Sequence, residues 1–442
     1  MRLVLPYNAR FIIDRLQQSG YTCYAVGGCV RDSILGREPA DWDFTTSALP
    51  EEIEAVFSDC RTINFGKQFG TIGIILDNEQ YEVTTYRIDG EYSDSRHPDA
   101  VSFSNSLQDD LSRRDFTVNA MAYNDTEGLV DYFDGQRDLS YGVIRCVGVA
   151  TNRFAEDALR ILRALRFAST LGFSIEPSTS AAILSGRKML SAVANERIST
   201  ELLKLLCGKN VDFVLRRYRS VFAVFIPELV GTFDFEQNNK HHNRDVYRHT
   251  VAAVKNIEPD PLLRTVMLFH DIGKPLSRTV DKYGVSHYYN HPVLGAAMTE
   301  EILRRLCMKR RFIEDAAILI RHHDYRITPD PVKIKKLLGK LGVETVYRLY
   351  KVQRADILAQ SNYQREEKLD NLSKVEAETE RIIRDGECYN LKMLAISGVD
   401  LLHIGITDGE TIGKTLDLLL NRVITGELSN DKDRLISAAK AM

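Results

Sequence analysis

The sequence lacks the features that mark secreted and membrane proteins. Its seven cysteines are scattered through 442 residues without a Cys-x-x-Cys pair, so a disulfide framework is not expected. The N-terminus has no basic segment leading into an apolar one, and no hydrophobic run approaches the length of a membrane span. We therefore expect a cytoplasmic protein that does not bind membranes, and nothing in the sequence indicates an obligate protein partner.

The charge is close to balanced overall but is unevenly distributed. The net charge is −3, yet the first 150 residues contain 13 Lys or Arg and 24 Asp or Glu, against 45 and 37 in the rest. An acidic first part would repel a phosphate backbone, so we expect any nucleic acid to lie mainly along the later segments. The simpler alternative is that these charges only keep the surface soluble.

Hydrophobic patterning predicts an α+β fold, with a small mixed sheet and helices first and an all-helical remainder. The sheet would contain a strand at 21–26 and a hairpin of strands 71–76 and 80–86 around Asp77-Asn78-Glu79. The predicted helices include residues 7–19, an uninterrupted helix at 154–170, and helices at 195–206 and 412–424. The chain is long enough for three or four domains.

The most informative stretch is Gly27-Gly28-Cys29-Val30-Arg31-Asp32, followed by Asp41-Trp42-Asp43. Two glycines let the backbone approach a phosphate, and Arg31 supplies a fork of hydrogen-bond donors. Two carboxylates one residue apart point to the same side of a strand, an arrangement that holds divalent metal over a triphosphate. An isolated Asp-x-Asp is usually solvated charge or a turn, but the upstream motif favours the metal site. Glu82 could add a third carboxylate or be an ordinary exposed strand residue.

These residues belong to a longer ordered series of motifs. The series comprises Gly27-Gly28-x-x-Arg31-Asp32, Asp41-x-Asp43, Arg113-Arg114-Asp115-Phe116-Thr117-x-Asn119-Ala120, Glu156-Asp157-x-x-Arg160 and Glu196-Arg197-Ile198-x-x-Glu201-x-x-Lys204-Leu205-Leu206. It resembles the motifs of class II nucleotidyltransferases, which include bacterial CCA-adding enzymes and poly(A) polymerases. The resemblance covers the first half of the chain densely.

The resemblance implies a metal-dependent transfer of a nucleotide to a 3′-hydroxyl. Two Mg²⁺ ions held by Asp41 and Asp43 would stabilise the charge on the attacking and leaving oxygens. The β- and γ-phosphates would bind to Gly28 and Arg31. The family pattern also assigns a nucleotide contact to Arg114, and a ribose pocket to Asp115 with Asn119. Alternatively, Arg113 and Arg114 pair with the nearby Asp109 or Asp110.

Base choice can be argued from hydrogen bonding. The carboxylate of Asp157 only accepts and the guanidinium of Arg160 only donates, so together they require an amino donor beside a ring acceptor. Cytosine and adenine present that edge, whereas guanine and uracil present the reverse. Arg160, Arg163 and Arg166 recur every three residues on one side of a helix, and the family pattern turns them toward the nucleotide. The alternative is a solvated basic helix face.

A histidine-dense segment follows, because eight of the ten histidines lie between His241 and His323. Four residues, His249, His270, Asp271 and the distant Asp356, resemble the metal ligands of HD-domain phosphohydrolases, and Asp356 is placed by that resemblance only. His291, His322 and His323 would suit a second ion. Imidazole with carboxylate favours Mn²⁺, Fe²⁺, Co²⁺ or Ni²⁺. The resemblance implies hydrolysis of phosphoesters, including 2′,3′-cyclic phosphates at RNA ends. Alternatively, the domain keeps the fold without turnover.

The motifs predict four domains. They are a nucleotidyltransferase head at 1–145, a neck at 146–235 that binds the base and tRNA, an HD domain at 236–365, and a helical tail at 366–442 that binds tRNA. The polar segment Asp89–Pro98 resembles the flexible loop of CCA-adding enzymes, which favours addition of CCA or of A alone. It could also be a plain surface insertion.

The sequence therefore predicts an enzyme that adds CCA to the 3′ acceptor end of tRNA from CTP and ATP without a nucleic-acid template. A poly(A) polymerase or an A-adding enzyme is the alternative within the same chemistry. A nucleotide-signalling hydrolase, in which the HD domain acts and the head is a sensor, is the alternative from a different class.

Overall fold

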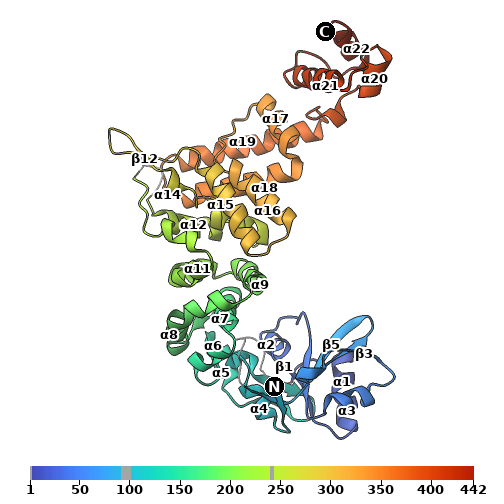
Figure 1. The fold of residues 1–442 in the computed structure, drawn as a ribbon, viewed down its shortest axis with the longest axis vertical. Helices are drawn as coiled ribbons and strands as arrows, with labels where there is room; N and C mark the ends of the chain where they lie inside the picture. Colours follow the sequence, from blue (N-terminus) through green and yellow to red (C-terminus); the bar gives the residue numbers. More distant parts are fainter. Residues whose placement is uncertain (1, 91–100, 239–242) are drawn as a thin grey trace. The chain divides into compact units, whose positions relative to one another are not determined.

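The computed structural model describes residues 2–90, 101–238 and 243–442 and divides into two compact units, Met1–Pro227 and Glu228–Met442 (Figure 1). Most of the predicted loop Asp89–Pro98, as well as His241, lies outside the described residues. No helix in the described ranges combines the length and apolarity that a membrane crossing requires. The four-domain division remains a prediction, since the chain separates here into two units.

A seven-stranded mixed sheet forms the centre of the first unit. Its strands, in spatial order, are β3 (Arg61–Gly66), β4 (Thr71–Leu76), β5 (Glu79–Thr85), β2 (Asp43–Thr46), β1 (Cys23–Val26), β8 (Met121–Asn124) and β9 (Gly128–Asp131). Only the β2–β5 pair is parallel, and the others are antiparallel. The predicted hairpin is confirmed, and its turn uses Asp77 and Asn78, both with positive φ. Every residue of β1 is buried, which explains its apolar sequence.

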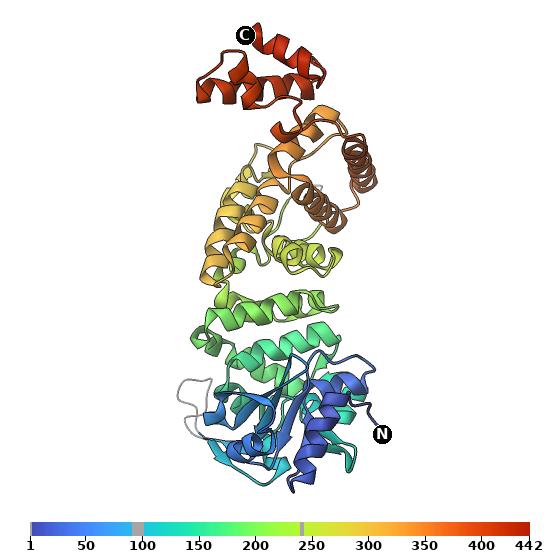
Figure 2. The same cartoon turned by 90° about the vertical axis from the view of Figure 1, so that its right-hand side faces the viewer.

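Helices surround this sheet, and the chain that follows the sheet is mainly helical (Figure 2). They are α1 (Tyr7–Gln18), α2 (Gly28–Ile34), α3 (Pro50–Val56), α4 (Leu107–Ser112), α5 (Gly135–Tyr141), α6 (Ala150–Glu156), α7 (Leu159–Leu171), α8 (Pro177–Gly186), α9 (Asn195–Leu206), α10 (Val211–Arg217) and α11 (Arg219–Phe225). Two short strand pairs accompany them, β6 (Arg87–Asp89) with β7 (Val101–Phe103) and β10 (Val143–Ile144) with β11 (Ser174–Ile175). The predicted helices 7–19 and 195–206 are confirmed.

The prediction of one uninterrupted helix over 154–170 was wrong. The chain leaves the helical conformation at Asp157, which has φ −142° and ψ 104°, and α7 then begins at Leu159. The side chain of Asp157 accepts a hydrogen bond of 3.0 Å from the backbone N–H of Leu159. An Asp that caps the following helix competes with helix continuation, which the apolar periodicity alone cannot reveal.

The second unit is almost entirely helical. Its elements are α12 (Val246–Asn256), α13 (Pro261–Phe269), α14 (Lys274–Ser277), β12 (Thr279–Val280), β13 (Ser286–His287), α15 (His291–Arg305), α16 (Arg310–His322), α17 (Pro331–Leu341), α18 (Val343–Ala359), α19 (Arg365–Arg384), α20 (Gly398–His403), α21 (Gly409–Ile424) and α22 (Lys432–Lys440). Helix α18 packs against α12, α13, α16 and α19. The last three helices have a separate apolar core that includes Leu401, Leu419 and Leu435.

Candidate active site and candidate metal centre

Asp43 opens strand β2 and Asp41 lies two residues before it. The parallel pairing of β2 with β5 places Asp43 opposite Glu82, which is an exposed strand residue. Desolvation, and then the negative charges of Asp41 and Glu82, raise the pKa of Asp43 to about 6, although the residue keeps an exposed surface. Carboxylates that repel one another in this way form a set of hard oxygen ligands that suits Mg²⁺.

The Gly-Gly turn lies next to Arg114. Gly27 has a φ of +82°, a conformation that favours glycine, and Gly28 begins α2. A Cβ atom on Gly27 would lie 3.2 Å from Nη1 of Arg114, so a side chain there would press on the guanidinium. The positive charge of Arg114 also lowers the pKa of Asp43, against the larger upward effects described above. The turn, the guanidinium and the carboxylates therefore form one neighbourhood.

Arg31, which the sequence assigned to phosphate binding, is buried and its donors are largely engaged. Nε and Nη2 bond to the carboxylate of Asp32 at 2.9 and 2.8 Å, and Nη1 donates to Oδ1 of Asn119 at 2.6 Å. Through Asn119, Arg31 connects the Gly27 turn and α2 to the segment that follows Arg114. Phosphate contact by Arg31 remains a prediction.

The wholly buried carboxylate of Asp110 pairs with both arginines of the Arg-Arg-Asp motif. The sequence had indicated Asp110 only as an alternative partner of these arginines. Asp110 accepts hydrogen bonds from Arg113 Nε at 2.9 Å, from Arg114 Nη2 at 3.2 Å and from Thr45 Oγ1 at 3.0 Å. Both arginines thus pair with Asp110, as the alternative interpretation had it. Nε of Arg114 is buried and has no hydrogen-bond partner. An orphaned donor of this kind is expected to find a partner in a ligand.

Three arginines meet over one aromatic ring. The guanidinium carbons of Arg31, Arg163 and Arg166 lie 4.9, 5.6 and 4.1 Å from the ring centroid of Phe167 on α7. Arg163 also donates from Nε to Asp115 at 2.8 Å. Against burial, which would raise it, the charge of Arg163 lowers the pKa of Asp115 to about 2. The predicted basic side of α7 is therefore largely paired and packed, not simply solvated.

The side chains of Asp157 and Arg160 bond to different partners, although the backbone N–H of Arg160 donates to the carbonyl of Asp157. Oδ2 of Asp157 accepts a hydrogen bond of 2.8 Å from Arg197 on α9, while Nη2 of Arg160 donates to the backbone oxygen of Arg113 at 3.0 Å. Each carboxylate oxygen has two lone pairs and a guanidinium has five N–H donors, so both side chains retain capacity for a base edge. Joint reading of a base by this pair remains a prediction.

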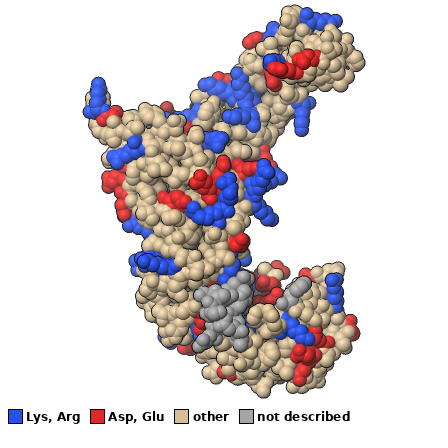
Figure 3. Space-filling view, in the orientation of Figure 1, with Lys and Arg blue, Asp and Glu red and all other residues tan. Residues whose placement is uncertain are grey.

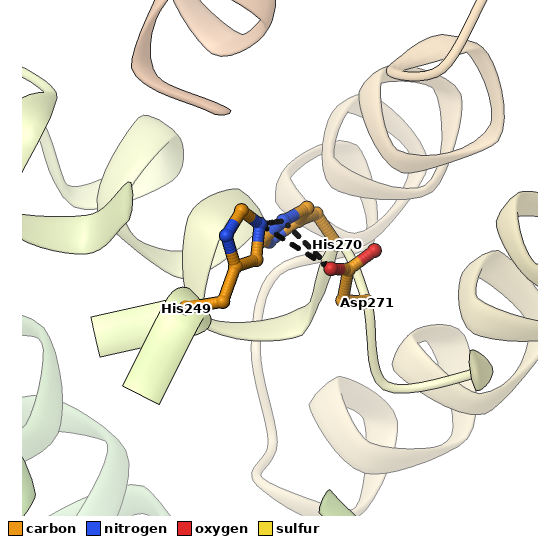
Figure 4. A group of neighbouring side chains, drawn as sticks. All are labelled: His249, His270 and Asp271. Atoms are coloured by element: carbon orange, nitrogen blue, oxygen red, sulfur yellow. Dashed lines mark hydrogen bonds and ion pairs between the residues drawn. The ribbon is translucent and has the colours of Figure 1, made fainter. Parts of the chain in front are cut away.

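In the second unit, the four predicted metal ligands converge. Nε2 of His249 lies 2.8 Å from Oδ1 of Asp356, 3.2 Å from Nε2 of His270 and 3.4 Å from Oδ2 of Asp271. Figure 4 shows His249 and His270 directed at each other beside the Asp271 carboxylate. They come from α12, the end of α13 and α18, so helices distant in sequence build this cluster.

The other oxygen of Asp271 faces a second group. Oδ1 of Asp271 lies 3.5 Å from Nε2 of His291 and 3.7 Å from Nε2 of His323. Of the two neighbouring candidates for the second ion, His323 faces this group, whereas His322 lies within 3.4 Å of Lys340 Nζ at the surface. A signal for this was present: Ile320 is buried on α16, and a residue three positions later lies on the same helix face.

Backbone carbonyls orient all four imidazoles. The Nδ1 atoms of the histidines lie near the carbonyl oxygens of Ala359 (3.4 Å from His249), Met267 (2.8 Å from His270), Tyr288 (2.7 Å from His291) and Ile320 (2.7 Å from His323). A carbonyl only accepts, so each Nδ1 carries a proton and each ring turns its Nε2 atom to the cluster. This is the second contact that metal-bound histidines normally make.

The cluster fits a cation on chemical grounds. Imidazole nitrogens and carboxylate oxygens that face one another at 2.8 to 3.7 Å need protons or cations between them. Oδ2 of Asp271 is buried without a hydrogen-bond partner, although Lys274 Nζ lies 2.7 Å away. Against burial, Asp271 and then Asp356 raise the pKa of His270 to about 10, because their carboxylates favour positive charge beside them. Mixed imidazole and carboxylate ligands suit transition-metal ions.

Two cavities reach the cluster. The larger, about 1130 Å³, is lined by Asp271, His291, His323 and Asp356 together with Lys274 and Tyr288. The smaller, about 300 Å³, is lined by His323 and Asp356 from the side of α18 and α19. A ligand of nucleotide size can therefore approach the buried residues.

Basic residues are concentrated in one segment of the first unit. Between residues 151 and 227 the chain has 12 Lys or Arg and 6 Asp or Glu, which locates much of the predicted basic excess. On the face of the second unit shown in Figure 3, Lys and Arg are interspersed with Asp and Glu. The charge therefore supports nucleic-acid contact by residues 151–227 more than by the rest of the later chain.

Three family models match the chain. Residues 23–145 match "Poly A polymerase head domain", residues 172–230 match "Probable RNA and SrmB-binding site of polymerase A", and residues 294–439 match "tRNA nucleotidyltransferase domain 2 putative". The second of these covers most of the basic segment.

Curated relatives and solved structures are similar to this chain over different lengths. A CCA-adding enzyme of Levilactobacillus brevis is 33% identical over 97% of this chain and 96% of its own. A CCA-adding enzyme of Staphylococcus aureus is 46% identical, but over 52% of this chain and 58% of its own length. The Bacillus stearothermophilus CCA-adding enzyme in complex with CTP has a TM-score of 0.74 at 28% identity, covering 98% and 96% of the two chains. The Thermotoga maritima enzyme complexed with tRNA has a TM-score of 0.60 at 22% identity and covers 100% and 96%, which supports the fold alone.

Proposed function

The chain belongs to the family of CCA-adding enzymes, and on that basis we propose that it adds CCA to the 3′ end of tRNA from CTP and ATP without a nucleic-acid template. The observation that carries the proposal is the grouping of Asp41 and Asp43 with the Gly27 turn and Arg114. This function requires access to tRNA in the cytoplasm, which is where we place the protein.

The residues of the head would divide the work of nucleotidyl transfer. Asp41 and Asp43 would hold Mg²⁺, which supplies stabilisation of charge on the attacking and leaving oxygens. Gly27 and Gly28 allow the triphosphate to approach the backbone, and the unsatisfied Nε of Arg114 gives it a donor. The 3′-hydroxyl of tRNA then attacks the α-phosphorus and pyrophosphate leaves.

Base selection would fall to the start of α7. Asp157 accepts from the amino group and Arg160 donates to the ring nitrogen of cytosine or adenine, and Arg197 holds the Asp157 carboxylate in place. Arg163 and Arg166 add positive charge on the same helix, although Asp115 and Glu201 pair with them. The pair would reject guanine and uracil because the buried donor and acceptor would be left unsatisfied.

The test uses tRNA transcripts that end before CCA or after CC, with labelled CTP and ATP. The proposal expects two C residues and one A on the first substrate, and one A on the second. An enzyme that elongates only the CC transcript is an A-adding enzyme, and one that makes long A tails is a poly(A) polymerase. If the protein incorporates neither nucleotide, the nucleotide-signalling hydrolase is the alternative that the result favours.

A second candidate function rests on the histidine cluster. We propose that His249, His270, Asp271 and Asp356 hold one transition-metal ion, with Asp271, His291 and His323 as the ligand group for a second. Such ions supply a nucleophile for hydrolysis of phosphoesters when bound. The supporting observation is that the Nε2 atoms of the four histidines converge on the carboxylates of Asp271 and Asp356, while each Nδ1 lies near a backbone carbonyl.

The metal content of purified protein and its cleavage of 2′,3′-cyclic phosphates test this second function together. The proposal expects bound Mn²⁺, Fe²⁺, Co²⁺ or Ni²⁺ and metal-dependent cleavage. If the protein binds these metals but cleaves no ester, the metal centre is supported and the hydrolase activity is excluded.

A further inference from the structure

Two aromatic rings stack on one another just before the histidine cluster in sequence. They belong to the hairpin that pairs β12 with β13 and projects beside α14 (Figure 1). The rings of His287 and Tyr289 are nearly parallel, with an interplanar angle of 6° and 5.5 Å between their centroids. Tyr289 is 69% exposed, so a face of its ring is open to solvent, and Val285 and Val293 add exposed apolar surface. An exposed apolar patch of this kind indicates a binding site.

The stacked pair, His287 and Tyr289, is held in place without a ligand. Nε2 of His287 lies 3.0 Å from Oδ2 of Asp281. The other carboxylate oxygen of Asp281 accepts from two backbone N–H groups of the turn, at 2.9 and 3.0 Å. Between the two rings in sequence, Tyr288 donates from its hydroxyl to the carbonyl of Gln237 at 2.9 Å. A third ring that stacks on this pair therefore meets a surface that is already ordered, which lowers the entropy cost of binding.

The stacked pair lines the larger cavity that reaches the cluster. His287 and Tyr289 line this cavity of about 1130 Å³ together with Asp271 and His291. The carbonyl of Tyr288 lies 2.7 Å from Nδ1 of His291. One short segment thus carries both the exposed ring and a proposed metal ligand. A ligand whose phosphate is at the centre can therefore extend along the wall that bears Tyr289.

The cavity combines two kinds of chemistry that a nucleotide also combines. The proposed metal centre takes a phosphoester, and an exposed aromatic ring stacks on a nucleobase because every base has a π face. Such a stack commonly contributes about tenfold or more in affinity. A phosphoester of a simple sugar or of an aliphatic alcohol has no ring for Tyr289. Stacking detects the presence of a base and not its identity, so all four bases are expected to bind.

We propose that Tyr289, supported by His287, binds the nucleobase of the phosphoester that reaches the histidine–aspartate centre. The centre then acts on nucleotides and RNA ends in preference to esters without a base. This inference rests on the proposed second function and narrows its substrates. In the reaction, a water oxygen bonds to phosphorus, one ring P–O bond of the 2′,3′-cyclic phosphate breaks, and the released ribose oxygen takes up a proton from the water. The stacked pair contributes binding alone.

Hydrolysis of two cyclic esters by the full-length, Mn²⁺-loaded protein tests the inference. Adenosine 2′,3′-cyclic phosphate carries a base, and methyl riboside 2′,3′-cyclic phosphate has none. We expect wild type to prefer the first ester by about tenfold or more in kcat/KM, and Tyr289→Ala to lose this preference through a higher KM. Tyr289→Phe should keep the preference, because the ring remains. A wild-type protein that cleaves both esters equally overturns the inference.

The matched control is Tyr283→Ala. It removes another exposed tyrosine of the same hairpin, which is not among the described residues that line this cavity. We expect the preference for the nucleotide to be unchanged in this variant. If Tyr283→Ala and Tyr289→Ala lower the cleavage of both esters to the same extent, the hairpin only supports the fold and the inference is overturned. Weaker tRNA binding in Tyr289→Ala with unchanged hydrolysis also overturns it.

Two further measurements separate the sources of the base and the two proposals. An RNA oligonucleotide with a 2′,3′-cyclic end should depend on Tyr289 as the mononucleotide does, and a lack of dependence overturns the assignment to RNA ends. Calorimetry with adenosine 2′,3′-cyclic phosphate and metal-free protein measures binding without turnover. The readout is the difference between wild type and Tyr289→Ala, since the head is also proposed to bind nucleotides. Binding that depends on Tyr289 in a protein that cleaves neither ester supports the base site and overturns the hydrolase.

Discussion

Asp110 and Arg114 form an ion pair of 3.2 Å in which the carboxylate has no exposed surface. The same carboxylate accepts from Thr45 on β2, two residues beyond Asp43. One buried charge thus connects the strand of the predicted metal ligands to the arginine beside the Gly27 turn. An isolated buried carboxylate would be costly, and its three partners explain why it is tolerated.

Replacing Asp110 should therefore affect nucleotide binding more than chemistry. In Asp110→Asn the hydrogen bond from Thr45 can persist, but the charge that holds Arg114 is lost. We expect KM for CTP and ATP to rise about tenfold with a smaller change in kcat. Asp109→Asn is the matched control, because that side chain bonds to Ser104 instead. A lower melting temperature with unchanged KM would assign Asp110 a structural role only.

Removing either carboxylate of the proposed Mg²⁺ site should abolish incorporation. We expect Asp41→Ala and Asp43→Ala to reduce nucleotide addition by more than about a thousandfold while tRNA binding persists, because transition-state stabilisation is lost and the basic segment is intact. Primer extension and filter binding on the same preparations check this. Incorporation within about tenfold of wild type would exclude the assignment.

The raised pKa of Asp43 predicts a pH dependence for Mg²⁺ binding. Because the folded pKa is about 6, the carboxyl group is protonated below that pH and metal must displace the proton. Mg²⁺ affinity should be constant above pH 7 and fall as the pH decreases through 6. Without metal, stability should decrease as the pH rises from 4 to 6, since the folded state binds the extra proton. Titration calorimetry and thermal unfolding, each repeated with Asp43→Asn, measure the two effects.

Base discrimination should depend on Asp157 and on the arginine that holds it. We expect Asp157→Ala to increase the use of UTP and GTP relative to CTP and ATP more than it slows transfer, because the acceptor for the amino group is lost. Arg197→Lys should change selectivity in the same direction but less. If competition assays show unchanged ratios, α7 is a scaffold and not a base reader.

The two candidate sites should be separable. The double substitution His270→Ala with Asp271→Ala removes proposed ligands of both groups in the cluster and lies in a different compact unit from Asp41 and Asp43. Sites without shared partners behave almost independently. We expect loss of bound transition metal and of phosphoester cleavage, with CCA addition within about twofold of wild type. Loss of both activities in a folded variant would show that the units are coupled.

Sequence patterns predicted those parts of the fold that depend on local chemistry. The Gly27 turn, the Asp77-Asn78 hairpin and helix 195–206 follow from backbone preferences and apolar spacing, and the structure confirms them. The break at Asp157 was missed because a capping side chain overrides periodicity. The pairing of Asp110 with Arg113 and Arg114 was predicted only as an alternative. Its hydrogen bond with Thr45 and the role of Phe167 were missed, since each depends on partners brought together only by the tertiary fold. The sequence analysis named His322 and His323 together, although helix phase distinguishes them.

The hydrogen bonds between the imidazoles and backbone carbonyls have a consequence for metal uptake by the proposed centre. His270, His291 and His323 each bond to the carbonyl three residues earlier, so the turn that carries the ring also sets its orientation. The orientation of these three imidazoles is therefore set by local backbone conformation, without an ion as a template. We expect that the proposed centre can take up a metal ion after the chain has folded.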